Sequence, residues 1–146
     1  MRRIEKIAYL YEAKRLVDLI IRRYCALVKE FSLRDYSPFI RNIINHVDFN
    51  VGEALSVKIL AKKFKVSPGN LSVQFRREKG MALTGYINAK RLERAKSMLH
   101  GSGLYVQEIA EQCGFLNINY FSRLFKRRFG VSPLEFRKKT ATLHKL

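Results

Sequence analysis

The sequence has little from which a metal site or a disulfide framework could be built. Its two cysteines, Cys25 and Cys113, form no CxxC pair, and we interpret both as reduced core thiols of a cytosolic protein. Its three histidines, His46, His100 and His144, lie far apart, with no cysteine or carboxylate partner at ligand spacing. We therefore expect neither a metal ion nor a cofactor.

Long apolar runs and acidic residues are also scarce. Residues 1–30 carry a charge every few positions, which excludes a signal peptide or a membrane span in this segment. Lys and Arg number 29 against 12 Asp and Glu, giving a formal charge of +17. Residues 1–50 hold ten bases and six acids, whereas residues 51–146 hold nineteen and six. Such an excess calls for a polyanion, usually nucleic acid and alternatively an anionic membrane surface, and it places the binding surface in residues 51–146.

The same shortage of acids argues against an enzyme. The six acids of residues 51–146 are dispersed, and no metal-ligand set or nucleophile with its base accompanies them. We expect a binding protein.

No run of alternating β-branched residues is present, so the chain is predicted to be all-α. Serine precedes each of the three prolines, Pro38, Pro68 and Pro133, and a Ser-Pro pair is typical of a helix start. Glu135 completes a capping box with Ser132. Apolar spacing predicts helices that include residues 40–47, 57–64, 84–100 and 106–113, the third being the longest of the four. This helix lacks a Ser-Pro start, and Thr84 is its expected cap.

Two segments of the chain repeat each other. Residues 55–66 align with residues 104–115 at an offset of 49, and Phe75, Arg77 and Gly80 align with their counterparts at an offset of 50. One residue has been added or lost between the two helices of the unit. Each copy is a short helix, a turn and a second helix ending at glycine, which is helix-turn-helix geometry. The second helix of such a unit can enter a DNA major groove.

The second copy contains the segment "YFSRLFKRRFG", residues 120–130. On a helix, its apolar residues Phe121, Leu124 and Phe125 fall on one side and dock on the first helix of the unit. Its outward side carries a polar, cationic stripe of four residues, namely Asn119, Ser122, Arg123 and Lys126. We interpret this stripe as a DNA-contacting face.

Most of the chain resembles a known family. The segment "EIAEQCGFLNINYFSRLFKRRFGVSPLEFRKK" (108–139) is similar to the C-terminal signature of the AraC/XylS-type transcription regulators. Residues 60–80 and 86–99 match the family's other helix-turn-helix and its connecting helix. The resemblance covers about residues 38–140. It implies an all-α DNA-binding domain at 38–146, with helix-turn-helix units at about 55–80 and 104–130 joined by a connecting helix at about 84–100.

The resemblance implies that both second helices enter successive major grooves on one face of double-stranded DNA. These grooves recur about every 34 Å, so the site would be near twenty base pairs long. It also implies a transcription activator with RNA polymerase as a partner and a cytoplasmic, nucleoid-associated location. The residues themselves leave activation and repression as alternatives. The alternative to DNA binding is a helical protein-protein interaction module that reuses the helix-turn-helix fold.

The family's contact positions fall on the two copies unequally. The implied base-reading residues are Gly69, Ser72 and Val73 in the first unit and Asn119, Ser122 and Arg123 in the second. The implied phosphate-binding residues are Ser67, Arg76, Arg77, Asn117, Lys126 and Arg127. Arg123 can pair with guanine and Asn119 with adenine, whereas Gly69 and Val73 offer no hydrogen bond. We therefore expect the second unit to dominate base discrimination.

Residues 1–37 match no family and are interpreted as a helical linker or interaction segment. A long helix is predicted over residues 4–31, with an apolar stripe that includes Val17, Ile21, Tyr24 and Val28 at coiled-coil spacing. The stripe either packs on the rest of the same chain or forms a homodimer. A chain that begins almost at once inside a helical pattern favours the C-terminal fragment of a longer, effector-responsive regulator over a small stand-alone one.

Overall fold

The computed structural model describes residues 3–32 and 35–143, and these residues form eight α-helices and no β-strand. The all-α expectation is confirmed. The contacts divide the chain into two compact units, Met1–Ser37 and Pro38–Leu146. The helices are α1 (Arg3–Ser32), α2 (Pro38–Phe49), α3 (Val57–Lys63), α4 (Pro68–Lys79), α5 (Leu83–Gly101), α6 (Val106–Gln112), α7 (Ile118–Phe129) and α8 (Pro133–Leu143).

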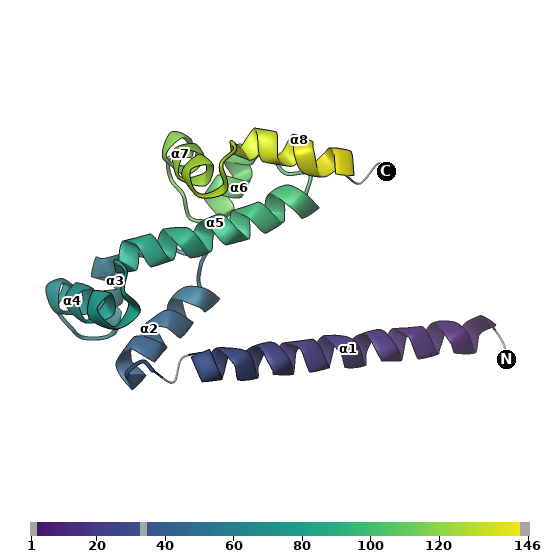
Figure 1. The fold of residues 1–146 in the computed structure, drawn as a ribbon, viewed down its shortest axis with the longest axis horizontal. Helices are drawn as coiled ribbons and strands as arrows, with labels where there is room; N and C mark the ends of the chain where they lie inside the picture. The colour runs from purple at the N-terminus through teal and green to yellow at the C-terminus, as the bar shows by residue number, and fades with distance from the viewer. Residues whose placement is uncertain (1–2, 33–34, 144–146) are drawn as a thin grey trace. The chain divides into compact units, whose positions relative to one another are not determined.

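The N-terminal unit, Met1–Ser37, contains the long helix α1, as expected (Figure 1). Its apolar stripe is exposed, with Val17 and Ile21 each 53% and Tyr24 68% accessible. Cys25 is exposed on the same helix, so its interpretation as a core thiol was wrong. The error follows from assigning a half-apolar helix to a core, because an amphipathic pattern does not say what covers the apolar face.

The C-terminal unit, Pro38–Leu146, is organised around α5, which joins the two helix-turn-helix units (Figure 1). Helices α3 and α4 contact each other near the start of α5, and α2 packs on α4. Helices α6 and α7 form the second pair, and α8 packs on both α5 and α7. The expected connecting helix at about 84–100 is therefore confirmed.

The two pairs repeat the same hydrogen bonds. The Val66 amide donates to the Ala61 carbonyl at 3.0 Å, and its counterpart Phe115 donates to Ala110 at 2.9 Å. Both second helices end at a left-handed glycine, Gly80 with φ 75° and Gly130 with φ 79°. The extra residue of the second turn is Leu116, which is fully exposed. A surface position explains how one copy accommodates a residue that the other lacks.

The helix starts follow the Ser-Pro prediction with one exception. Helices α2, α4 and α8 begin at the three prolines. At α8 the Glu135 carboxylate accepts from the Ser132 amide at 2.7 Å, and the Ser132 hydroxyl accepts from the Glu135 amide at 3.3 Å. The expectation for Thr84 was wrong, because α5 begins at Leu83 after Ala82, which makes no side-chain cap. Leu83 is 2% exposed, so its burial in the core draws the helix start ahead of Thr84.

The core of the second pair is built from aromatic rings. Phe121 lies 5.7 Å from Phe125 and 5.1 Å from Phe115, measured between ring centroids, and all three are buried. Cys113 is buried in the same cluster, as predicted, and burial raises the pKa of its thiol. Such rings bury a large apolar area each and fix the height of α7 above α6 and α5.

Candidate nucleic-acid interface

Helix α7 presents the predicted polar stripe outward. Asn119 and Arg123 are exposed and Ser122 is half-buried at the helix surface, while Phe121 and Phe125 are fully buried on the opposite side. The guanidinium of Arg123 lies 5.8 Å from the centroid of the Tyr120 ring. A cation at this distance from an aromatic face is attracted to it, so Tyr120 restricts the directions in which Arg123 can point.

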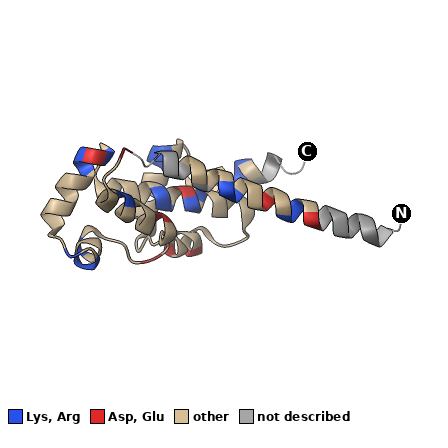
Figure 2. Cartoon of the chain, turned by 90° about the horizontal axis from the view of Figure 1, so that it is seen from below, with Lys and Arg blue, Asp and Glu red and all other residues tan. Residues whose placement is uncertain are grey.

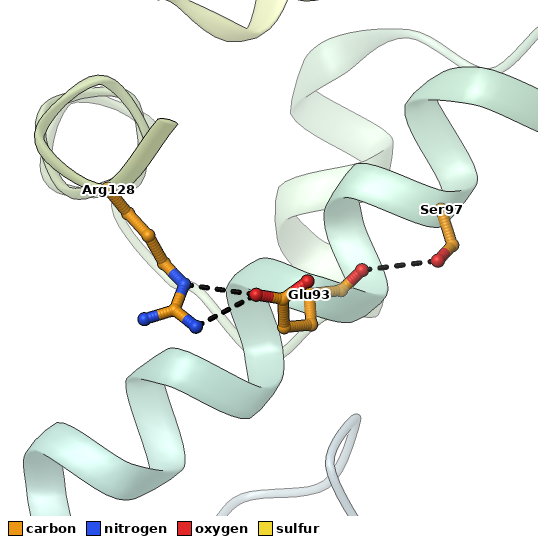
Figure 3. Close-up of polar contacts among 3 residues, drawn as sticks. All are labelled: Glu93, Ser97 and Arg128. Atoms are coloured by element: carbon orange, nitrogen blue, oxygen red, sulfur yellow. Dashed lines mark hydrogen bonds and ion pairs between the residues drawn. The ribbon is translucent and has the colours of Figure 1, made fainter. Parts of the chain in front are cut away.

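Tyr120 is itself fixed to the connecting helix. Its hydroxyl accepts a hydrogen bond from the side-chain amide of Asn88 on α5, at 3.1 Å. At the other end of α7, Arg128 reaches Glu93 on α5, with its Nη2 2.8 Å and its Nε 3.2 Å from the same carboxylate oxygen (Figure 3). Both side chains of this pair are over 40% exposed, so its contribution to stability is at most about 1 kcal/mol. These contacts orient α7 on α5 at both ends.

Helix α4 presents a poorer surface for hydrogen bonding. Gly69 is exposed, with open space where a side chain would be, and Val73 is 65% exposed. The Ser72 hydroxyl donates to the Pro68 carbonyl at 2.8 Å, so its proton is engaged within the helix. The oxygen of Ser72 can still accept a hydrogen bond, because a hydroxyl has two lone pairs. The positions of Gly69, Ser72 and Val73 therefore offer one hydrogen-bond acceptor and one apolar contact.

Helix α4 is also attached to α5. The buried Phe75 ring lies 5.6 Å from the Tyr86 ring, between centroids. The Tyr86 hydroxyl donates to Asp48 at the end of α2, at 2.9 Å, and the Lys90 ammonium lies 3.1 Å from the same oxygen. The first helix-turn-helix pair is thus held on α5 through both α2 and α4.

The predicted phosphate-binding side chains lie in the last turns of the two helices. Arg76, Arg77, Lys126 and Arg127 are all exposed. Arg77 lies 4.0 Å from its neighbour Glu78, a contact at the limit of an ion pair. Figure 2 shows Lys and Arg residues in blue at several separate places on the chain. Exposed bases of this kind remain able to meet phosphate oxygens.

The two predicted helix-start residues act as caps. The Ser67 hydroxyl accepts from the Asn70 amide at 3.2 Å, and the Asn117 side-chain oxygen accepts from the Tyr120 amide at 2.9 Å. Each cap engages one first-turn amide and leaves other first-turn amides directed along the helix axis. A phosphate approaching either helix would meet these amides rather than the capping side chains.

The described part of the chain contains neither a metal-ligand cluster nor a membrane-spanning helix. Among the residues that the structure describes, no three His, Cys, Asp or Glu side chains gather as a set of metal ligands. Over the same described residues, no helix combines the length and apolar character that a bilayer-crossing segment needs.

Comparison with known proteins agrees with this geometry. A family model described as "Helix-turn-helix domain" matches residues 60–139, more than half of the chain. The chain is 38% identical over 96 residues to the uncharacterized HTH-type transcriptional regulator YijO of Escherichia coli, an alignment that covers 66% of this chain and 34% of that protein. It is similar in structure to an AraC-type regulator from Chromobacterium violaceum, with a TM-score of 0.63, 27% identity and coverage of 71% of this chain and 93% of the other. The chain belongs to the AraC/XylS-type family.

A further structural likeness is to a domain solved with DNA. The DNA-binding domain of AdpA, in complex with a target DNA, has a TM-score of 0.66 and 25% identity, covering 70% of this chain and 93% of that domain. The chain spans about a third of the length of the first curated relatives it matches. These findings confirm the expected family, a family of DNA-binding transcription regulators and not of enzymes. The individual contact residues of this AraC-type domain stay predictions.

Sequence reasoning missed the residues that hold this AraC-type domain together. Arg91 on α5 is 9% exposed and is the only charged side chain buried among the described residues. A signal for it exists in the sequence, because Arg91 lies four residues from both Ile87 and Ala95 on the buried stripe of that helix. The other contact residues are polar and are exposed or half-buried, so apolar periodicity does not identify them; they are Asp48, Asn88 and Glu93.

Proposed function

We propose that this protein is a sequence-specific regulator of transcription that inserts α4 and α7 into successive major grooves on one face of double-stranded DNA. The observation that carries the proposal is the duplicated helix-turn-helix unit, whose turns and caps form the same hydrogen bonds while its second copy presents a cationic stripe. The similar AdpA domain is a DNA-binding domain in complex with a target DNA, which supports DNA binding by this fold. Helix α5 has 19 residues and therefore extends over about 28 Å, comparable to the spacing of adjacent grooves.

We infer that α7 carries most of the base discrimination. Arg123 has two donors in a rigid fork and is exposed, and Asn119 has an exposed amide, so both suit paired hydrogen bonds to base edges. Helix α4 would add phosphate contacts through Arg76 and Arg77, a methyl contact through Val73 and one acceptor at Ser72. Lys126, Arg127 and the amides near Ser67 and Asn117 would complete the phosphate contacts.

Selection of bound sequences from a random double-stranded library tests this function. We expect an asymmetric site of about two helical turns, with most of its information in one half. Titration of the selected site at two salt concentrations should show affinity falling steeply as salt rises, because phosphate contacts release counterions. A protein that enriches no sequence, and whose weak binding ignores salt, would instead be a helical interaction module.

We further propose that this chain acts as the DNA-binding part of a longer, effector-responsive activator. RNA polymerase would be its partner at the promoter, and the cytoplasm, at the nucleoid, its location. The similar relatives are about three times as long as their alignment with this chain, which supports a longer protein. The names of the similar activators RhaS and RhaR support activation.

We propose a homodimer through residues 4–31. The exposed stripe at Val17, Ile21, Tyr24 and Val28 repeats at coiled-coil spacing, and its burial against a second copy would remove a large apolar area from water. Sedimentation of the full chain should show a dimer that Ile21→Asp disrupts. The control Arg22→Asp adds the same carboxylate next to the stripe and should leave the dimer intact; a wild-type monomer at all concentrations would refute the proposal.

A further inference from the structure

The side chain of Arg91 lies where the two helix-turn-helix units meet. It projects from the middle of α5, and its Nη2 donates to the carbonyl of Glu53 at 2.9 Å, with a longer contact of 3.4 Å from Nε to the carbonyl of Val51. Residues 51–53 belong to the segment that leads from α2 into the first unit. One edge of the Arg91 guanidinium is therefore fixed to the first helix-turn-helix unit.

The same guanidinium also contacts the turn of the second unit. Its central carbon lies 5.8 Å from the centroid of the Phe115 ring. Next to that ring, a Cβ placed on Gly114 would lie 2.8 Å from both Nε and Nη2 of Arg91. The turn between α6 and α7 thus approaches the guanidinium as closely as a backbone without a side chain allows.

A second close approach brings the two helix-turn-helix units into direct contact. A Cβ placed on Gly52 would lie 2.8 Å from the carbonyl oxygen of Gln112, the last residue of α6, and 2.9 Å from Nη1 of Arg94. The backbone that leads into the first unit therefore packs against the end of the first helix of the second. We name residues 51–53, Arg91, Arg94 and residues 112–115 the junction.

The junction has the properties of a rigid connection. Burial lowers the pKa of Arg91, yet an arginine stays charged under all ordinary conditions, so its charge must be met by carbonyl oxygens and an aromatic face. Moving the first helix-turn-helix unit away would leave the buried cation of Arg91 without its carbonyl acceptors, which is unfavourable. The relative position of the two units is therefore defined by contacts across α5 as well as by the helix itself.

We propose that Arg91 is a positioning residue that fixes the distance and rotation between the two recognition helices and so sets the spacing of the two half-sites on DNA. The proposal rests on the proposed function. Each base pair inserted between the half-sites rotates one against the other by about 35°, since B-DNA has about ten base pairs per turn. A rigid reader cannot follow such a rotation, whereas a reader with a loosened junction can.

The test compares the wild type with Arg91→Met, which keeps an unbranched side chain and removes the donors and the charge. Each protein is titrated with the site selected by the wild type, with the half-site of α7 alone, and with sites lengthened or shortened by one base pair. For the wild type we expect the full site to bind on the order of a hundredfold more tightly than the half-site, as for two linked contacts with matched geometry. The Arg91→Met protein should bind the half-site as before, lose about tenfold on the full site, and discriminate less between spacings.

Two controls separate positioning from charge and from folding. Lys139→Met removes one exposed positive charge on α8 and should leave the spacing preference unchanged. Arg91→Lys keeps the charge but not the planar fork, and we expect it to restore only part of the preference. If Arg91→Met does not fold, Gly52→Ala tests the junction from the other side, because its methyl group must push residues 51–53 away from Gln112.

The outcomes are distinct. A wild type that binds no selected DNA refutes the proposed function, and the question of spacing does not arise. A wild type that binds, with an Arg91→Met or Gly52→Ala protein that is folded and keeps the full spacing preference, overturns the positioning role. Equal losses on the half-site and the full site also overturn it, because they indicate a reduced folded fraction alone.

Discussion

The two turns adopt the same left-handed conformation with different residues, and this predicts opposite effects of substitution. Lys65 has φ 55°, and Gly114, its counterpart at an offset of 49, has φ 81°. A left-handed residue with a side chain loses about 1–2 kcal/mol relative to glycine in the folded state. The greater freedom of glycine in the unfolded chain offsets about 0.4–1 kcal/mol of this. Lys65→Gly should therefore stabilise the domain by about 0.5 kcal/mol, since Lys65 is exposed and its side chain is not needed in the core.

Gly114→Ala should have a much larger effect in the other direction. Its methyl group would lie 2.8 Å from the Arg91 guanidinium, which is buried and held by carbonyls and cannot simply move aside. Overpacking of this kind destabilises by about 1–3 kcal/mol, in addition to the left-handed strain. We expect a net destabilisation of about 2–3 kcal/mol once the unfolded-state effect is included.

Urea unfolding followed by far-ultraviolet circular dichroism measures both changes, and a double-mutant cycle identifies the cause. If the guanidinium is responsible, Gly114→Ala should be less destabilising by at least 1 kcal/mol in an Arg91→Met background than in the wild type. A Gly114→Ala protein as stable as the wild type would refute the reasoning. Equal effects of Gly114→Ala in both backgrounds would refute the assignment to Arg91.

Three further predictions concern the DNA-contacting surface and a helix start. Arg123→Ala should relax specificity at one base by about 1–3 kcal/mol on a randomised-site library, and Val73→Ala should have less effect; equal losses would refute the dominance of the second unit. Lys126→Ala should weaken all sequences alike and make log K less steep in log salt by about one unit, measured by titration over a salt series. Hydrogen bonds from the Ser132 amide and hydroxyl lower the pKa of Glu135, so its stabilising effect is complete above the unfolded-state pKa and is lost as pH falls through the folded-state pKa. The difference in urea midpoint between the wild type and Glu135→Gln should accordingly shrink on acidification, and a difference independent of pH would contradict this.

Local patterns predicted the parts of the fold that depend on local chemistry. A Ser-Pro pair satisfies a helix start within three or four residues, and the prolines of α2, α4 and α8 lie where the sequence placed them. The repeat offset predicted two equivalent turns and one extra residue, and Leu116 is that residue. Local reasoning was wrong at Thr84, because the burial of Leu83, a tertiary effect, decided where α5 begins.

Arg91 shows why the junction could not be predicted. Apolar periodicity counts only apolar residues, so an arginine on a buried stripe reads as an interruption. The carbonyls that make its burial possible come from residues 38 and 40 positions earlier in the chain. Nothing in the sequence near Arg91 indicates these partners, and the four-residue spacing to Ile87 and Ala95 is a signal only of its burial.

The proposed inequality of the two recognition helices is connected with the proposed role of the junction. A helix that contacts mainly phosphates carries little sequence information, since phosphate contacts are the same at every site. Held at a fixed distance from α7, however, α4 can meet the backbone only where the DNA between the two grooves takes the required twist and bend. The energy of that deformation depends on the sequence being deformed. A junction centred on Arg91 would therefore give the poorer helix a part in specificity that its own side chains, Gly69 and Val73, cannot provide.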